Sequence, residues 1–174
     1  MPDTPLWPPL KGAANERQAV RPPTKRLASL GKRPLMNYSR IAVAGLGATV
    51  AYFALGFLLL ALLPFADEVR QYAAVYRPEE SMKRVAPVGM VAMLLAMMAL
   101  ATLYAVAFRD GSPVAQGVRF GFLIAVFAAG SFVLHNYVSL NIGLRLALLQ
   151  AVAYFVQLLG AGVVIALIYR PTRL

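Results

Sequence analysis

The chain has 174 residues, of which 60% are hydrophobic and only 14% are charged, so it is too apolar for a soluble domain of this length. It contains no cysteine, which excludes disulfides, thiolate catalysis and cysteine-ligated metals. The formal net charge of +10 would favour nucleic acid as a partner of a soluble protein, but here the distribution of the charges along the chain is more informative.

Residues 1–40 form a basic, proline-rich segment. They hold seven of the twelve prolines, eight Lys or Arg and two acidic residues, and they show no sustained apolar period. Such a composition buries too little surface to offset the entropy of ordering, which predicts a disordered tail. No apolar stretch with a small-residue cleavage site is present, so the tail does not read as a signal peptide. Met36 directly precedes the first apolar block and is a second candidate start. Residues 1–35 are therefore interpreted as a dispensable tail or as lying outside the native protein.

Four apolar blocks follow the tail, and they define a domain over residues 41–174. Each block reaches the length of about 20 residues that a helix needs to cross a hydrocarbon layer about 30 Å thick. The blocks are residues 41–65, 85–108, 118–138 and 144–169. The predicted fold is an all-α, polytopic integral membrane protein, built as a bundle of four transmembrane helices.

The basic residues indicate an orientation. Twelve Lys or Arg lie in the tail, in the connection between the second and third blocks, and at the C-terminus. The opposite side has four in the loop 66–84, plus Arg145 at the start of the last block. An excess of Lys and Arg marks the cytoplasmic side of a membrane protein. Both termini are therefore predicted to be cytoplasmic, in the inner (plasma) membrane of a bacterial-type cell.

The loop 66–84 is the longest polar connection, and Pro78 divides it. Before Pro78, apolar residues recur with a helical period, which predicts a short amphipathic helix at the exterior interface: Val69, Tyr72, Ala73 and Tyr76. After Pro78, two i,i+4 ion pairs of favourable polarity are expected: Glu79 with Lys83, and Glu80 with Arg84. This second part is predicted to continue into the second membrane helix.

Small residues recur every four positions in the third block: Gly117, Gly121, Ala125 and Ala129. Such a stripe lets a second helix approach closely in lipid. We interpret it as a packing seam within the bundle; the alternative is a homo-oligomer interface. At about 100° per residue, His135 and Asn136 flank the seam, while Tyr137 points away toward an aromatic belt. His135 is thus expected to face protein rather than lipid.

The fourth block places three polar side chains, Gln150, Tyr154 and Gln157, on one helical face. A short turn makes the third and fourth helices antiparallel neighbours and brings Ser131 to a similar depth. The conservative interpretation is interhelical hydrogen bonding. The alternative is a ligand cavity or solute path, whose candidate residues are Ser131, His135, Asn136, Gln150, Tyr154 and Gln157.

His135 is the only histidine in the chain, and the four apolar blocks contain no carboxylate. A metal site is therefore not expected. The preferred interpretation is a structural residue at the membrane interface. Alternatives are a ligand contact or pH sensor, or a general base meeting Glu79 or Glu80. A methionine stripe in the second block is interpreted as adaptable packing rather than a Cu(I) site: Met90, Met93 and Met97.

These features favour a non-enzymatic membrane protein, a structural or accessory subunit that associates through helix packing. The alternatives are a channel or carrier for a small, weakly polar solute and, more weakly, a lipid-active enzyme at the exterior surface. No catalytic residue, metal or cofactor is predicted. The expected partners are the lipid bilayer and a homo-oligomer or larger membrane complex, and nucleic acid is not among them.

Overall fold

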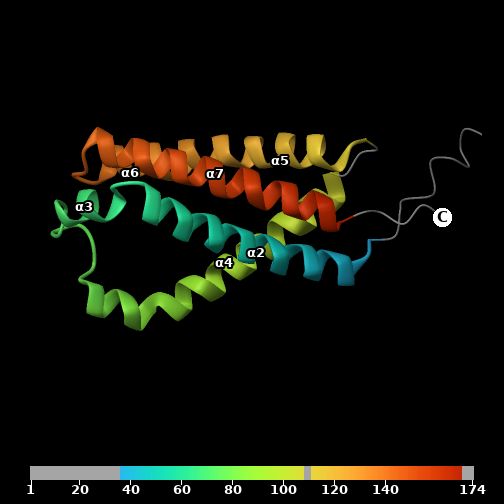
Figure 1. Ribbon diagram of the computed structural model, residues 1–174, viewed down its shortest axis with the longest axis horizontal. Coiled ribbons are helices and arrows are strands. Elements are labelled where there is room, and N and C mark those ends of the chain that lie inside the picture. Colours follow the sequence, from blue (N-terminus) through green and yellow to red (C-terminus); the bar gives the residue numbers. More distant parts are fainter. Residues whose placement is uncertain (1–35, 108–110, 170–174) are drawn as a thin grey trace, which may run out of the picture. The chain divides into compact units, whose positions relative to one another are not determined.

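The computed structural model describes residues 36–107 and 111–169, so the predicted tail over residues 1–35 lies outside the described part. The described residues are helical and contain no strand (Figure 1). The elements are α2 (Tyr38–Leu62), α3 (Phe65–Arg70), α4 (Glu79–Ala107), α5 (Pro113–Ala128), η2 (Ala129–Leu134), α6 (His135–Ser139) and α7 (Leu144–Ile168). Four helices are long and apolar enough to cross a membrane, because α5, η2 and α6 together form one span of 27 residues. The predicted all-α, four-helix fold of a multi-pass membrane protein is confirmed.

The helices extend beyond the apolar blocks because local polar groups complete their ends. The Asn37 side chain accepts a hydrogen bond from the Arg40 backbone N–H at 3.0 Å and thereby caps α2, which begins at Tyr38. Glu79 and Glu80 occupy the first turn of α4, where acidic side chains interact favourably with the positive end of the helix dipole. Pro113 stands in the first turn of α5, a position that needs no backbone N–H.

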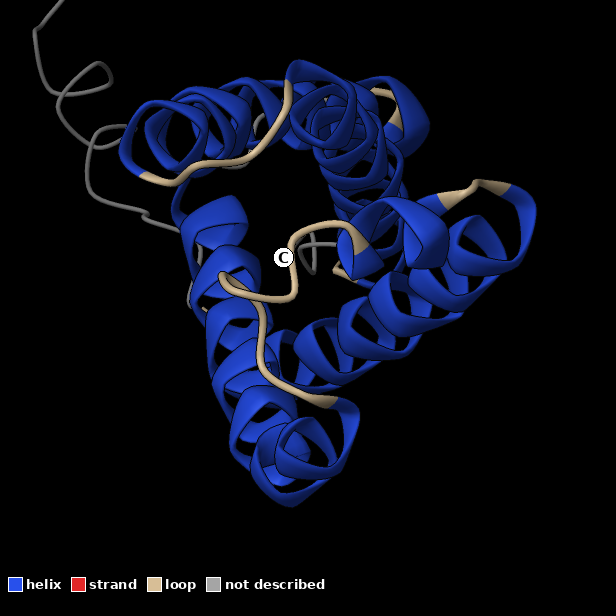
Figure 2. Cartoon of the chain, turned by 90° about the vertical axis from the view of Figure 1, so that its left-hand side faces the viewer, coloured by secondary structure: helices blue, strands red, loops and turns tan. Residues whose placement is uncertain are grey.

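The four spans alternate in direction, so the described part has two distinct ends. One end, which we call the terminal side, contains the start of α2, the end of α4, the start of α5 and the end of α7 (Figure 1). The opposite end, the α3 side, carries α3 and the short turn between α6 and α7. Figure 2 views the α3 side end-on and shows short loops joining the helices there.

The α5 and α7 helices pack closely through glycine. A Cβ atom on Gly117 would lie 2.7 Å from the Val163 Cα atom, and one on Gly121 would lie 2.7 Å from the Leu158 carbonyl oxygen. Both atoms belong to the α7 backbone, which cannot move aside as a flexible side chain does. Only a hydrogen atom fits at these two positions, and this close approach maximises van der Waals contact between the helices.

On the terminal side, α2 and α4 complete the core. Gly45 of α2 lies directly against the Met98 side chain of α4. Met97 and Tyr104 of α4 are buried, and the Tyr104 ring meets the rings of Phe120 and Tyr169 edge-on, with centroids 5.3 and 6.3 Å apart. Small residues and interlocking rings therefore close this half of the bundle.

Toward the α3 side the same two helices separate. No residue of α2 is buried beyond Tyr52, and no residue of α4 is buried before Met97. Figure 1 shows α4 diverging from α2 toward its Glu79 end. Pro87 lies inside this part of α4 and lacks the N–H that would bond to the preceding turn. The divergence leaves space beside α2, and the candidate site lies there.

The third span changes its helical register at η2, a π-helical turn. Buried positions follow a four-residue spacing up to Ala125, continue at Ala128, and then advance by five residues to Val133. A π turn adds one residue and so rotates every later side chain about the helix axis. This rotation decides which polar residues at the end of the span face the other helices.

Candidate functional site: a cavity between α2 and α7

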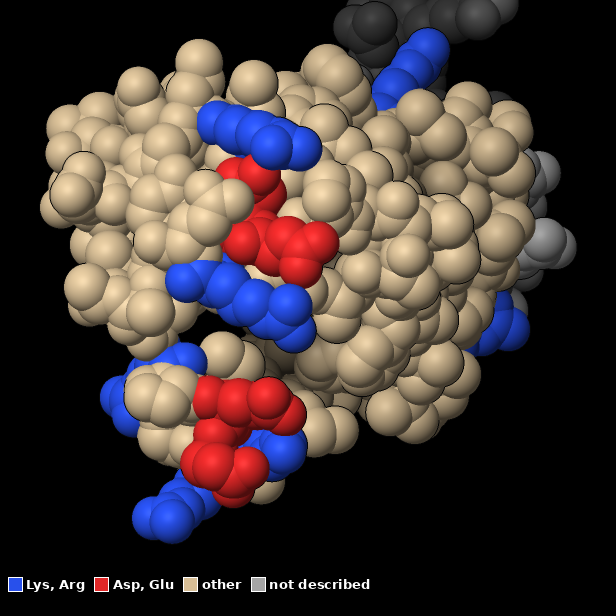
Figure 3. All heavy atoms as spheres, turned by 60° about the vertical axis from the view of Figure 1, so that its left-hand side comes forward, with Lys and Arg blue, Asp and Glu red and all other residues tan. Residues whose placement is uncertain are grey.

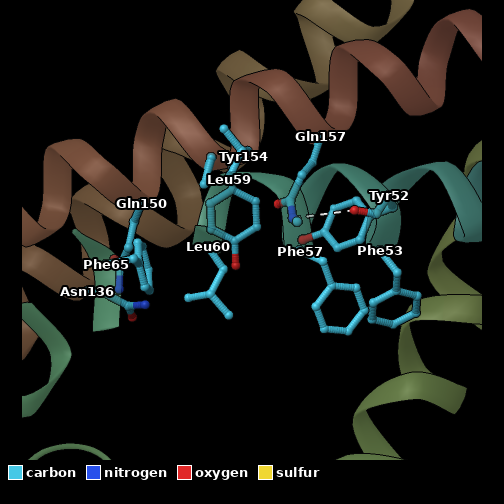
Figure 4. A pocket seen from close by; sticks show the side chains of 12 residues that line it. Tyr52, Phe53, Phe57, Leu59, Leu60, Phe65, Asn136, Gln150, Tyr154 and Gln157 are labelled. Carbon is cyan, nitrogen blue, oxygen red and sulfur yellow. Dashed lines mark hydrogen bonds between the residues drawn. The ribbon is translucent and has the colours of Figure 1, made fainter. Parts of the chain in front are cut away.

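A cavity of about 430 Å³ lies between α2 and α7, in the half of the bundle that carries α3 (Figure 4). Its size falls within the range of about 300–1,000 Å³ that is typical of small-molecule sites. Twelve residues line it: Tyr52, Phe53, Gly56, Phe57, Leu59, Leu60, Phe65, Asn136, Gln150, Ala153, Tyr154 and Gln157.

The polar wall comes mainly from α7. Gln150, Tyr154 and Gln157 follow one another at helical spacing, so they share a face and extend over roughly 10 Å of the helix axis at about 1.5 Å per residue. Figure 4 shows their side chains directed toward the space beside α2. The predicted polar face of the fourth helix thus lines a cavity.

Both glutamines also contact neighbouring segments. Gln150 Nε2 donates a hydrogen bond to the Tyr76 hydroxyl at 2.8 Å, and Gln157 Nε2 donates a longer one, 3.5 Å, to the Tyr52 carbonyl. Each amide group carries two N–H bonds and a carbonyl oxygen, so one partner leaves hydrogen-bonding capacity toward the cavity. Interhelical bonding and cavity lining, which the sequence presented as alternatives, are combined in the same side chains.

Aromatic and aliphatic side chains form the opposite wall. Phe53, Phe57 and Leu60 follow α2 at helical spacing, and Phe65 adds a ring from the start of α3. Phe57 and Leu60 are 69% and 50% exposed although they line the cavity, so they mark its rim. They lie in the membrane-spanning part of α2, which means that the cavity opens sideways toward lipid.

The cavity does not continue through the bundle. Beyond Gln157, the α7 positions Leu158, Ala161 and Ile165 are buried in the hydrophobic core on the terminal side. Tyr52 and Ala48 of α2 belong to the same core. The site is therefore a pocket that ends in close packing and not an open channel.

The segment that contains α3 covers the α3 side of α7. Glu68 is only 4% exposed, and its carboxylate pairs with the Arg145 guanidinium at 2.7 Å. Further along the segment, the Tyr72 hydroxyl lies against Gly143, and Tyr76 accepts the bond from Gln150. The helix observed in the predicted interfacial segment has only six residues, and Tyr72 and Tyr76 follow its end and contact Gly143 and Gln150.

Charged side chains gather at this end of the molecule, and the acidic side chains in this view all lie there, each group beside Lys or Arg (Figure 3). Besides the pair of Glu68 with Arg145, Arg70 contacts Asp67 at 3.2 Å, and Lys83 contacts Glu79 at 3.0 Å and Glu80 at 3.4 Å. Glu80 therefore pairs with Lys83 instead of the predicted partner Arg84. These exposed pairs contribute little to stability.

The π turn separates the polar residues of the third span. Asn136 follows Val133 by three residues and lines the cavity. His135 is exposed, with Ser139 as its polar contact at 3.5 Å, so the expectation that His135 faces protein is wrong. The expectation assumed a regular 100° rotation throughout the span. Ser131 is also outside the lining, and its hydroxyl donates to the Phe127 carbonyl at 2.7 Å.

The remaining small residues of the predicted seam differ in environment. Gly117, Gly121 and Ala125 are buried, and the two glycines lie against α7 of the same chain. Ala129 is only partly buried because the register shifts there. Of the methionine stripe, Met97 is buried and Met90 is 57% exposed. Within the described ranges, no three His, Cys, Asp or Glu side chains are placed to hold a metal ion together.

Sequence reasoning missed two parts of the site. One is the ion pair between Glu68 and Arg145, which ties the α3 segment to the start of α7. The other is the aromatic wall of α2. Its signal was present in the i, i+4, i+7 spacing of Phe53, Phe57 and Leu60, but a uniformly apolar helix gives no reason to choose one face.

The cavity offers hydrogen bonds and ring contacts. Its described lining includes amides and phenols, but no carboxylate, lysine, arginine or histidine. The chemistry of this lining suits an uncharged molecule better than a charged one. Comparisons with protein-family models, curated proteins and solved structures find no match to this chain. The chemistry of the site is therefore interpreted from its geometry.

Proposed function

We propose that this chain is a non-enzymatic membrane protein that binds a small, weakly polar molecule in the cavity between α2 and α7. The observation that carries the proposal is the cavity itself, with a polar wall of Gln150, Tyr154 and Gln157 at membrane depth. Amides and phenols in hydrocarbon need hydrogen-bond partners, and a cavity that displays them toward lipid is suited to supply those bonds to a ligand.

Two features of the packing favour this function over the accessory subunit expected from the sequence. Gly117 and Gly121 of the third span are covered by α7 of the same chain, so in this fold these two positions are not open to a second copy. The close-packed terminal side also interrupts any continuous path, which favours binding, or a carrier with a second conformation, over a channel.

The proposal includes an orientation in the inner membrane of a bacterial-type cell, with the terminal side cytoplasmic. The surplus of Lys and Arg on that side supports it. Because the chain has no cysteine, single-cysteine variants report each side directly. A membrane-impermeant maleimide applied to intact cells is expected to label Ala74→Cys and not Ser112→Cys. The reverse pattern would contradict the orientation.

Binding is tested by filling the cavity. Ala153 lines the cavity, whereas Val152 on the same helix is 50% exposed, so Ala153→Phe and Val152→Phe form a matched pair. The wild type and both variants are excised from native membranes in polymer nanodiscs, and the retained small molecules are identified by mass spectrometry. We expect one compound to be retained by the wild type and by Val152→Phe and depleted at least tenfold in Ala153→Phe. Equal small-molecule content in all three samples would contradict the proposal.

A further inference from the structure

The described lining contains no charged group, and this restricts the ligand. A charged molecule would lose its hydration in the cavity without gaining a counterion, which costs several kcal/mol per charge even after relaxation. The nearby charges of Glu68 and Arg145 are already paired with each other at 2.7 Å and do not line the cavity. An uncharged ligand is therefore favoured.

The polar groups are spaced along the helix in a way that suits two acceptor atoms. Gln150 and Tyr154 are one helical turn apart, about 5.4 Å along the axis, and Gln157 follows at the next turn. Figure 4 shows the Tyr154 hydroxyl directed into the cavity, and no described group is hydrogen-bonded to it. The free O–H and N–H groups suit a ligand with two oxygens on opposite sides of a six-membered ring.

The opposite wall favours a flat ring. Phe53, Phe57 and Phe65 face the polar wall together with Tyr52, and aromatic side chains gain from offset or edge-on contact with another ring beyond the area that they bury. A purely aliphatic ligand would use neither this wall nor the amides. The volume of about 430 Å³ is nearly three times that of an engineered cavity of about 150 Å³ that binds benzene, so a substituted ring with part of a tail fits.

The position of the rim indicates how the ligand arrives. Phe57 and Leu60 are exposed within the membrane-spanning part of α2, and α4 diverges from α2 toward the α3 side (Figure 1). A ligand that enters there must already be dissolved in the bilayer. An apolar tail attached to the ring would remain in lipid at the rim while the ring occupies the cavity.

We propose, on the basis of the proposed function, that the ligand is the head group of a lipid-soluble quinone. The Tyr154 O–H and the N–H groups of the two glutamines donate to its carbonyl oxygens, while the phenylalanine rings pack against its face. No redox step is part of this proposal. The chain binds the ring and orients it from the bilayer.

The test uses the full chain in phosphatidylcholine nanodiscs and two probes with the same carbon skeleton, 2-decyl-1,4-benzoquinone, which carries two carbonyl oxygens, and decylbenzene, which carries none. Bound probe is measured by mass spectrometry after subtracting that in empty nanodiscs. We expect saturable quinone binding with a Kd at least tenfold lower than that of decylbenzene. Tyr154→Phe is expected to weaken quinone binding about fivefold to tenfold, as for the loss of one hydrogen bond. The matched control Tyr137→Phe, at an exposed tyrosine outside the cavity, is expected to leave it unchanged.

The outcomes separate the two proposals. Equal saturable binding of both probes, abolished by Ala153→Phe, would overturn the quinone class and keep the cavity as a binding site. The same holds for quinone binding that is insensitive to Tyr154→Phe but lost in Ala153→Phe. Both proposals would be overturned if neither probe showed saturable binding and if the wild type, Ala153→Phe and Val152→Phe retained the same small molecules in native nanodiscs.

Discussion

The two halves of the bundle are built from the same helices but packed in opposite ways. On the terminal side, α2 buries residues from Ile41 to Tyr52 and α4 buries residues from Met97 to Tyr104. On the α3 side, neither helix buries any residue, and α7 has none between Ala147 and Leu158. Glycine and alanine therefore bring helices together in one half, whereas amides and large rings keep them apart in the other.

The difference shows where a membrane protein gains stability and where it keeps room for a ligand. Lipid is as apolar as leucine, so helices associate through close van der Waals contact and not through exclusion from water. Small residues provide that contact on the terminal side. On the α3 side, a few buried apolar side chains lie at the end of the third span and the start of α7, among them Val133, Leu146 and Ala147. Polar contacts join the α3 segment to α7 there, and the cavity remains open to the bilayer.

The largest expected effect is at the glycine seam. Gly121→Leu would place side-chain atoms against the α7 backbone, and we expect a loss of about 3 kcal/mol in the free energy of unfolding, measured by SDS titration in mixed micelles. Gly89→Leu is the matched control, because a Cβ at Gly89 meets no atom within 4 Å. Equal stability of the two variants would contradict the close packing of α5 on α7.

Met97 tests the contrast within a single helix. Met97→Ala removes a side chain that is 1% exposed in the core on the terminal side. We expect it to lower the free energy of unfolding by about 2 kcal/mol, because the side chains around Met97 lose their packing contacts. Met90→Ala, on the diverging part of α4, is expected to change the free energy of unfolding by less than about 0.5 kcal/mol. A larger cost at Met90 than at Met97 would reverse our assignment of the two halves.

The ion pair tests how the α3 segment is held. Arg145→Met leaves the Glu68 carboxylate buried without a partner and is expected to cost about 1 to 2 kcal/mol, less than a fully buried pair because Arg145 is largely exposed. Glu68→Gln is expected to cost less, since it leaves the remaining charge in water. Arg70→Gln, which removes an exposed partner of Asp67, serves as the control. Chymotrypsin cleavage between Tyr72 and Ala73 should become faster in the same order.

The smallest expected effect is at His135. Because this side chain is exposed and its described polar contact is the long one to Ser139, His135→Gln is expected to change the free energy of unfolding by less than about 0.5 kcal/mol. It should also leave retention of the small molecule in native nanodiscs unchanged. Asn136→Leu, at the neighbouring residue that lines the cavity, should reduce that retention. Loss of the ligand in His135→Gln would contradict the register that we assign to α6.

The sequence by itself determined the four membrane helices, because apolar length is a local property that any segment carries alone. It also identified the polar face of α7 and the small-residue stripe of the third span. It did not predict the Asn37 cap, which starts the first span before the apolar pattern begins. The start of α4 at Glu79, directly after Pro78, agrees with the predicted continuation of the loop into the second span.

Only the tertiary structure decided what these faces do. Regular periodicity placed both His135 and Asn136 beside the seam, whereas in the structure, after the π turn at η2, Asn136 lines the cavity and His135 is exposed. The pairing of Glu68 with Arg145 joins residues 77 positions apart, and the cavity is formed by side chains from α2, α3, α6 and α7 together. The physical reason is that lipid satisfies every apolar face equally. Periodicity can therefore mark a helix for the membrane, but only contacts between helices select the faces that pack and the faces that bind.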